Sequence, residues 1–183
     1  VYCVRDPGPR VVRALCRRLV LCAQAGAIAT ETRLEIEPLG GTYNLMPNDA
    51  LTSVTLKNLK ALTDIAYSPE EESFAQAIQQ TLPAPAPLAM AGEVAERDGD
   101  LSKGSTDVGD ISWVVPTTGF RTACWVPGTP AHSWQAVAAG GTTIGRKGME
   151  LAARVLAATA WDIAHDRNVL RRARAELEQR TRY

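Results

Sequence analysis

The apolar and polar positions of the first forty residues follow two different periods. The segments "VYCVR" (1–5) and "ETRLEIEPL" (31–39) alternate apolar and polar residues, which is typical of half-exposed strands. Between them, "RVVRALCRRLVLCAQAGAIAT" (10–30) places Val11, Val12, Leu15, Leu19 and Cys22 near one side of a helix, with arginines on the other. The pattern predicts a strand, a helix and a second strand, which together form a small α/β unit.

Two further helices are predicted from their start signals. Asn48 or Asp49 can cap a run that extends towards Leu62. In "SPEEESFAQAIQQTL" (68–82), Ser68 can act as the cap and Pro69 suits the first helical position. The three glutamates that follow favour a helix N-terminus, because they complement the helix dipole.

From residue 83 to 103 the composition shifts to Pro, Ala, Gly and charged residues, which predicts an irregular surface excursion. After it, "ISWVVP" (111–116) and "RTACWVP" (121–127) are interpreted as two buried strands separated by a Thr-Thr-Gly turn. The segment "SWQAVAAG" (133–140) then predicts a short helix.

The C-terminal part predicts two helices. A long helix is expected over residues 142–166, with small residues prominent on the side that faces inward; the residues predicted on that side are Met149, Ala152, Ala153, Leu156, Ala160 and Ile163. The polar segment 167–180 predicts a final helix, either on the surface or frayed.

Composition and charge exclude several classes of protein. The 183 residues carry 20 basic and 20 acidic side chains, which offers no electrostatic footprint for nucleic acid or an anionic membrane. No apolar run approaches the length of a membrane span, and no segment resembles a signal peptide. None of the four cysteines forms a C-x-x-C pair, which argues against structural zinc. We therefore expect a cytoplasmic protein with reduced thiols.

Because the chain starts without methionine, we also expect it to be part of a longer polypeptide.

His132 is the first candidate for chemistry. It lies in "PGTPAHSWQ" (127–135), after an expected strand and before an expected helix, in a loop whose glycine and prolines restrict the backbone. Imidazole is a common metal ligand, and loops at strand ends are where open α/β sheets hold their sites. By itself, however, His132 is better interpreted as a polar side chain that closes a loop. His165, near the end of the long predicted helix, suits the negative end of the helix dipole.

Asp107 and Asp110 form the second candidate. They lie in the glycine-rich segment "KGSTDVGD" (103–110), immediately before an expected strand. There they could hold a metal, orient a metal-bound histidine or bind a cationic group of a substrate. The alternative is ordinary loop chemistry, in which Ser, Thr and Asp side chains bond the nearby backbone.

Several separated motifs together resemble the C-terminal portion of a known enzyme family. The motifs are "GSTDVGDISWVVPT" (104–117), "PGTPAHSWQAVAAGG" (127–141) and "IGRKGMELAARVLAATAWD" (144–162), preceded by "VYCVRDPGPRVVRAL" (1–15) and "LGGTYNLMPNDAL" (39–51). They are similar to the hippurate hydrolase and aminoacylase-like metallo-amidohydrolases, the twentieth metallopeptidase family. The resemblance covers nearly the whole chain apart from the 83–103 excursion.

The resemblance implies a fold. We expect an α/β protein in which residues 46–183 form the C-terminal part of a metallo-exopeptidase-like catalytic domain, a sheet flanked by helices. Residues 1–45 would form the second half of an α+β lid or dimerisation domain. The protein would then form a homodimer, or pair with a related polypeptide, through that lid.

The resemblance also implies a chemistry. Family members hold two divalent metals, usually zinc or manganese, and cleave the amide bond of an N-acyl amino acid with the help of a glutamate base. An aromatic acyl-glutamate such as aminobenzoyl-glutamate is the favoured substrate. The family's C-terminal histidine ligand falls on His132, while Asp107, Asp110 and Gly141 fall on positions that orient ligands or the substrate.

The sequence departs from the family at two points. Arg146 stands where the family pattern suggests a histidine, and its effect is left open. In addition, no H-x-D motif or Glu-Glu pair precedes the lid segment, so the catalytic glutamate and most ligands are expected in an N-terminal half outside this chain. The chain alone is then expected to be inactive. The alternative interpretation is a non-catalytic dimerisation or interaction module that derives from such an enzyme.

Overall fold

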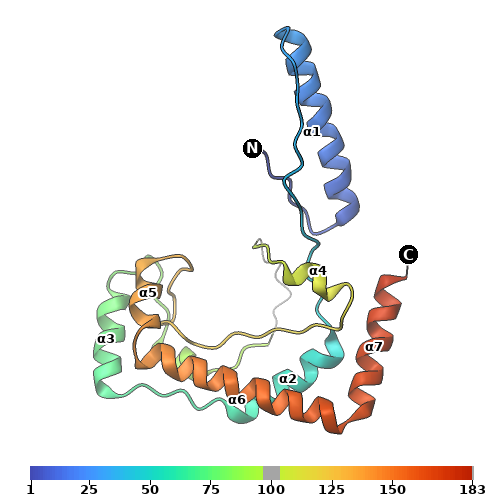
Figure 1. Cartoon of the computed structure of the whole chain (residues 1–183). Coiled ribbons are helices and arrows are strands. Elements are labelled where there is room, and N and C mark those ends of the chain that lie inside the picture. Colours follow the sequence, from blue (N-terminus) through green and yellow to red (C-terminus); the bar gives the residue numbers. More distant parts are fainter. Residues whose placement is uncertain (97–103, 183) are drawn as a thin grey trace. The chain divides into compact units, whose positions relative to one another are not determined.

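The computed structural model describes residues 1–96 and 104–182, and its regular elements are helices (Figure 1). The α-helices are α1 (Pro9–Ala29), α2 (Asp49–Leu62), α3 (Pro69–Gln79), α4 (Val108–Ser112), α5 (Trp134–Gly140), α6 (Thr143–His165) and α7 (Arg167–Thr181), with a 3₁₀ helix η1 (Leu88–Gly92) between α3 and α4. The predicted helices at 10–30, 49–62, 69–82 and 133–140, together with the long C-terminal helix, are confirmed within a few residues.

The predicted α/β fold class is wrong. No strand forms among residues 1–96 and 104–182, and the backbone pairing found there is a single parallel bridge between Pro47 and Thr117. In that bridge the backbone N–H of Asn48 donates to the carbonyl of Thr117 (2.8 Å). The expected sheet flanked by helices, and the α+β lid before it, are therefore both corrected to a helical architecture.

The four expected strands do not form, and the reason can be identified. An alternating pattern shows that a segment can be half-buried, but a strand also needs a neighbour that pairs with its backbone. Segments 1–5, 31–39 and 121–127 have no such ladder in the described chain. The segment 111–116 instead turns on itself, because the N–H groups of Val114 and Val115 both donate to the carbonyl of Ile111 (3.0 and 2.9 Å).

The chain divides into two compact units, which are described separately. Unit 1 comprises Val1–Met46 and Ser102–Val115, and unit 2 comprises Pro47–Leu101 and Pro116–Tyr183. The predicted domains, 1–45 and 46–183, stay a prediction. Of the irregular excursion expected over 83–103, residues 88–92 form η1, and residues 97–103 lie outside the described part of the chain.

Unit 2 has two small apolar cores along α6. The first joins α3, α5 and the start of α6 through buried Ala75, Ile78, Val126, Ala139 and Ile144, with Leu82 beside them. The second joins α2 to α7 through three buried residues, Leu51, Val169 and Ala173. The final polar helix is thus neither frayed nor merely on the surface. Glu176 accepts hydrogen bonds from the first backbone N–H groups of α2 (2.8 and 3.0 Å).

The helix starts in unit 2 follow from short polar signals. Asn48 caps α2, and its side-chain oxygen accepts from the N–H of Leu51 (3.1 Å). Ser68 and Glu71 form a reciprocal capping box at α3, with Pro69 in the first turn. Ser133 and Thr142 cap α5 and α6 in the same way as Asn48 caps α2. These side chains satisfy N–H groups that a helix leaves without internal partners.

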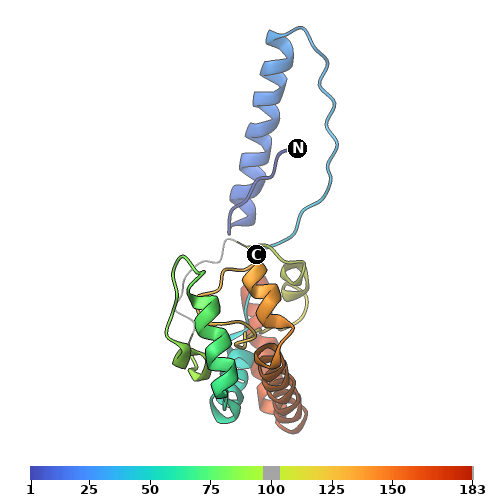
Figure 2. The same ribbon diagram turned by 90° about the vertical axis from the view of Figure 1, so that its left-hand side faces the viewer.

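Unit 1 is built differently, because its long helix has no buried residue. In α1, Val11, Leu15, Leu21 and Ile28 are all exposed. After α1 the chain returns as an extended segment (Figure 2). One tie between the two is the hydrogen bond from the Arg13 guanidinium to the hydroxyl of Tyr43 (3.0 Å).

The predicted inward side of the long helix is also corrected. In α6 the buried residues are Ile144, Gly145, Gly148, Leu151, Val155 and Thr159. Met149, Ala153, Leu156 and Ala160, which were expected inside, are exposed, while Ala152 and Ile163 are half-buried. Both sides of the helix are apolar, so periodicity alone could not decide which one packs.

Candidate functional site

The loop that carries His132 is fixed at both ends. At its start Val126 is buried, and its carbonyl accepts from the N–H (3.1 Å) and the hydroxyl (2.6 Å) of Thr129. At its end the Ser133 hydroxyl donates to the carbonyl of Pro130 (2.7 Å) and also caps α5. The sequence therefore folds the segment into two consecutive turns that present residues 130–132 to solvent.

A glycine lets this loop approach the segment before η1. Gly128 has φ +88°, and a side chain there would meet the carbonyl oxygen of Ala84 at 2.6 Å and the nitrogen of Ala86 at 2.8 Å. The N–H of Ala86 donates to the carbonyl of Pro127 (3.5 Å). A residue other than glycine would be strained at this φ and would also clash, so the close approach requires Gly128.

His132 itself adopts a left-handed backbone with φ +59°. Such a φ is uncommon outside glycine and costs free energy, although histidine tolerates it better than most residues. The side chain is exposed, and its ring makes no hydrogen bond to the described residues. The loop thus holds an accessible imidazole on a constrained backbone, which is suited to ligand binding.

Asp107 and Asp110 belong to unit 1, at the start of α4 rather than before a strand. Both residues are exposed. Asp110 accepts a hydrogen bond from the backbone N–H of Tyr43 (2.7 Å), which ties residues 43–46 to α4. Asp107 occupies the N-cap position of α4 without a side-chain capping bond. The carboxylate of Asp110 therefore has a structural partner, although that partner lies 67 residues away along the chain and not in the nearby backbone.

Further contacts strengthen this tie within unit 1. The fully buried Ser112 hydroxyl accepts from the N–H of Met46 (2.9 Å), and the Trp113 indole donates to the carbonyl of Asn44 (2.9 Å). A Cβ on Gly109 would lie 2.0 Å from the carbonyl oxygen of Tyr43. Gly109 is therefore needed for the close contact between α4 and the extended segment.

Gly141 and Arg146 lie at the junction of α5 and α6. Gly141 ends α5 with φ −83°, and the nearest atom to a Cβ built on it is 4.0 Å away. It is exposed and follows α5, whereas His132 precedes α5, so both belong to unit 2. Arg146 is exposed in the first turn of α6.

The described residues do not by themselves form a metal centre. Among residues 1–96 and 104–182, no group of three or more His, Cys, Asp or Glu side chains is placed so that it could hold a metal ion. His132 and Gly141 lie in unit 2, and Asp107 and Asp110 lie in unit 1. The donor set fits one ligand, the imidazole of His132, and does not fit a complete two-metal site.

The ion pair between Glu71 and Lys147 was not predicted from the sequence. Glu71 is only 7% exposed, and its carboxylate accepts from the ammonium of Lys147, which also donates to the carbonyl of Ala66 (2.6 Å). Burial raises the pKa of Glu71, but hydrogen bonds from Lys147, Thr143 and the Ser68 N–H outweigh it and lower the pKa to about 2. The capping pattern at Ser68 was visible in the sequence, whereas Lys147 lies 76 residues further along the chain.

The same carboxylate affects a neighbouring phenol. Burial and the negative charge of Glu71 together raise the pKa of Tyr67 to about 12. Since the Tyr67 hydroxyl is buried and has no hydrogen-bond partner among the described residues, it has no group to stabilise its anion. The cluster therefore links α3 to α6 and does not offer a base or a nucleophile to a substrate.

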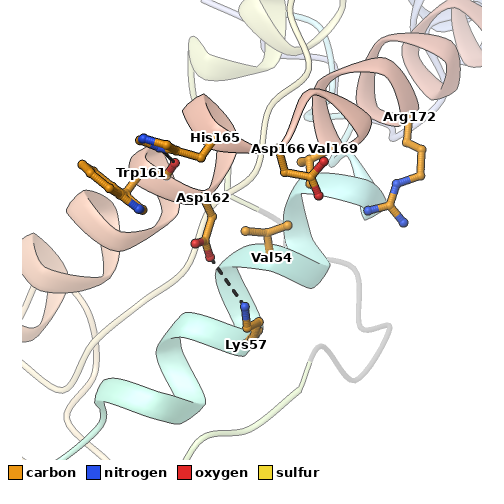
Figure 3. A pocket seen from close by; sticks show the side chains of 8 residues that line it. All are labelled: Val54, Lys57, Trp161, Asp162, His165, Asp166, Val169 and Arg172. Carbon is orange, nitrogen blue, oxygen red and sulfur yellow. Dashed lines mark hydrogen bonds and ion pairs between the residues drawn. The ribbon is translucent and has the colours of Figure 1, made fainter.

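An open cleft of about 380 Å³ lies between α2, α6 and α7. Figure 3 shows Lys57 and Asp162 pointing towards one another (3.8 Å), and the Trp161 and His165 rings stacked with centroids 3.9 Å apart. His165 Nδ1 is 2.9 Å from the Trp161 carbonyl at the end of α6, as expected for a helix-terminal histidine. Two acidic and two basic residues line this cleft together with His165, so its charges do not select a cation or an anion.

Comparison with known proteins shows a similarity that the geometry of the described residues does not reveal. The chain is 29% identical over 207 residues to a curated bacterial protein. It is similar to a component of the p-aminobenzoyl-glutamate hydrolase of Escherichia coli (strain K12). The similarity covers 99% of this chain and 43% of the relative, so the chain spans less than half of that protein's length. The resemblance predicted from the motifs is confirmed.

Two other comparisons gave no match. No family model matches the chain, and no solved structure does. Among the described helices, none is both long and apolar enough to cross a membrane.

Proposed function

We propose that this chain is the C-terminal portion of a metal-dependent amidohydrolase that cleaves the amide bond of an N-acyl amino acid. The favoured substrate class is an aromatic acyl-glutamate such as aminobenzoyl-glutamate. The observation that carries the proposal is the similarity to the p-aminobenzoyl-glutamate hydrolase component along 99% of the chain. His132, which is accessible and has a constrained backbone, is the residue of this chain that we place at the metal centre.

His132 is assigned as one ligand of a divalent metal, zinc or manganese, in a centre of two. Bound metals of this kind polarise an amide carbonyl and lower the pKa of bound water. The remaining ligands and the general base would come from the portion of the relative that this chain does not match. The turns at Thr129 and Ser133 would fix the position from which the imidazole extends, because they fix the backbone on both sides of it.

The other candidate residues receive supporting roles. Gly141, beside the loop helix α5, would leave room for the substrate, since no atom lies nearer than 4.0 Å to its missing side chain. Asp107 would help to position the substrate or a ligand. Asp110 shares the same segment, but its carboxylate already holds the Tyr43 N–H, so we assign it the orientation of α4.

The test uses the longest natural polypeptide that contains this chain, with metal content and hydrolysis of aminobenzoyl-glutamate as the readouts. The panel also includes other acyl-glutamates and acyl-aspartates. Substitution His132→Ala should lower the metal content and abolish most turnover, because one ligand is lost. The matched control is His165→Ala, which removes the other histidine, at the end of α6, and should leave both unchanged.

Two outcomes would contradict the proposal separately. A His132→Ala protein that keeps two metals per chain would refute the ligand assignment. Failure of the unsubstituted polypeptide to hydrolyse any member of the panel would refute the proposed activity.

A second candidate function is an interaction or dimerisation module. It is favoured by α1, which exposes Val11, Leu15, Leu21 and Ile28 and carries four arginines without an acidic residue. In the cytoplasm, residues 1–45 would then join a second copy or a related polypeptide. Sedimentation of the chain alone tests pairing with a second copy: a dimer that Leu15→Glu dissociates supports it, and a monomer at all concentrations refutes it.

A further inference from the structure

Helix α6 has one side that packs within unit 2. Its buried residues face α2 and α5, and Leu151 and Val155 are 2% and 0% exposed. Close to its C-terminus, Thr159 and Asp162 accept hydrogen bonds from the Asn58 amide of α2 (3.3 and 3.0 Å). This side carries the buried residues of α6.

A second side of α6 is apolar and exposed, and it is here called the outer face. It comprises Met149, Ala153, Leu156 and Ala160, whose spacing of four, three and four residues places them within about 60° around the helix axis. Met149 is 61% exposed and Leu156 is 60% exposed. The outer face therefore runs for about three turns without a charge at these four positions, and exposed Arg146 and Glu150 lie along one edge of it.

Two charged residues of α6 lie on a third side. Lys147 and Arg154 are held by Glu71 and Asp64, respectively, and so point towards their partners in unit 2. A helix that is apolar on two sides and charged on a third is typical of one that is covered on two sides. The outer face was also the side that periodicity predicted to lie inward, which is the pattern expected of a surface that is buried in the working protein.

We propose that the outer face of α6 is the docking surface for the polypeptide that corresponds to the portion of the p-aminobenzoyl-glutamate hydrolase component that this chain does not match. This inference rests on the proposed function. Its support is the outer face together with the length of that relative, of which 43% is matched and the larger part is not. The alanines would let a partner backbone approach closely, and the absence of charge at these four positions fits an apolar partner surface.

The experiment measures the reactivity of thiols introduced on α6. Ala153→Cys is compared in this chain alone and in a single polypeptide that joins the unmatched portion of the E. coli protein to this chain. Maleimide labelling is located by peptide mass spectrometry, so that the natural cysteines do not interfere. The thiol at position 153 should react at least about tenfold more slowly in the joined polypeptide, since it reacts only when the interface opens.

Three further variants make the result decisive. Ala175→Cys, at an exposed position of α7, should react at the same rate in both polypeptides. Val155→Cys, on the packed side, should react slowly in both and reports that unit 2 is folded. Leu156→Cys repeats the measurement on the outer face in case Ala153→Cys perturbs the helix.

Equal rates on the outer face in the two polypeptides overturn the proposal. It is also overturned if the thiol in the chain alone reacts more slowly as its concentration rises by about two orders of magnitude, because a second copy then covers the outer face. Labelling does not depend on activity. If the thiol is protected in the joined polypeptide but no hydrolysis occurs, the docking surface is supported and the proposed function is contradicted. If hydrolysis occurs but the thiol is not protected, the proposed function is supported and the docking surface is contradicted.

Discussion

At the scale of single residues, Gly148 shows how closely α6 approaches the extended segment 121–127. A Cβ at this position would lie 2.6 Å from the Cys124 sulfur and 2.7 Å from the backbone oxygen of Ala123. Both contacts are shorter than those that real Cβ atoms make, and the backbone oxygen cannot move aside alone. The glycine therefore sets the separation between these two segments.

We predict that Gly148→Ala destabilises unit 2 by about 1–3 kcal/mol, the usual cost of overpacking a fitted contact. Gly141→Ala is the control, because the same substitution meets no atom nearer than 4.0 Å there. Urea unfolding of both variants measures the difference in free energy of unfolding. Equal stabilities for the two variants would show that segment 121–127 does not pack on α6 as described.

Single residues also show which features of the site the sequence predicts and which it does not. His132 was identified from its type, its neighbours and a family resemblance, and its positive φ was not foreseen. Asp110 was equally visible, but its hydrogen bond to Tyr43 joins residues 67 positions apart. Such a partner is set by the path of the chain and not by the local pattern, so the structural use of this carboxylate could not be predicted.

At the scale of elements, the N-terminus of α3 is held both by a local cap and by a contact with α6. Its capping box is local, and its link to α6 passes through the buried pair of Glu71 and Lys147. The pKa of Glu71 is about 2 in the folded chain, below its ordinary value of 4.5. Because the folded state lowers this pKa, the carboxylate stabilises the fold above pH 4.5, and this contribution is lost as the pH falls from 4.5 towards 2.

We predict that Glu71→Gln lowers the free energy of unfolding at neutral pH by about 1.5–3 kcal/mol, as expected for hydrogen bonds to a charged group. The difference from the unsubstituted chain should shrink as the pH falls below 4.5, because this carboxyl then takes up a proton in the unfolded chain, which stabilises the unfolded state relative to the folded one. Unfolding in urea between about pH 7 and pH 3 measures both effects. The control is Glu72→Gln, next to it in the first turn of α3 and exposed. A difference that is independent of pH would contradict the role of the charge.

Among the elements, the positions of the long helices and of α5 were predictable, whereas those of α4 and η1, and the side of α6 that packs, were not. Ser68, Asn48 and Ser133 act within three residues of their own positions, so their helices could be recognised locally. In α6, by contrast, Leu151 and Leu156 have the same residue type, yet one is 2% exposed and the other 60%. Which side packs depends on where α2 and α5 lie, and that information is not contained in the periodicity of α6.

At the scale of the whole molecule, stability is unevenly distributed. Helix α1 has no buried residue, whereas α6 has six. In proteins most of the stability of a helix comes from the packing of its apolar face, which α1 lacks among the described residues. We predict that backbone amides of α1 exchange with deuterium within minutes in the chain alone, and that those around Val155 exchange more slowly by about two or more orders of magnitude. Hydrogen exchange with mass spectrometry checks this. Equal protection would mean that α1 is covered in solution.

The chain by itself should not hydrolyse aminobenzoyl-glutamate. Its described residues offer the imidazole of His132 without two further metal-ligating side chains around it. Release of aminobenzoate, followed with zinc or manganese in excess, should therefore stay at the background rate. Turnover above that rate, lost in His132→Ala and kept in His165→Ala, would contradict the assignment of the remaining ligands to another polypeptide.

The sequence by itself determined the positions of the long helices and of α5, the accessible loop around His132 and the similarity to a hydrolase component. Each of these depends on residue type and on neighbours a few positions away. The tertiary structure decided that the alternating segments form no sheet within the described chain, that α7 packs on α2 and that Asp110 ties α4 to Tyr43. It also decided which side of α6 is buried. These features depend on partners far along the chain, because a strand needs a backbone to pair with and an apolar side needs a surface to cover it.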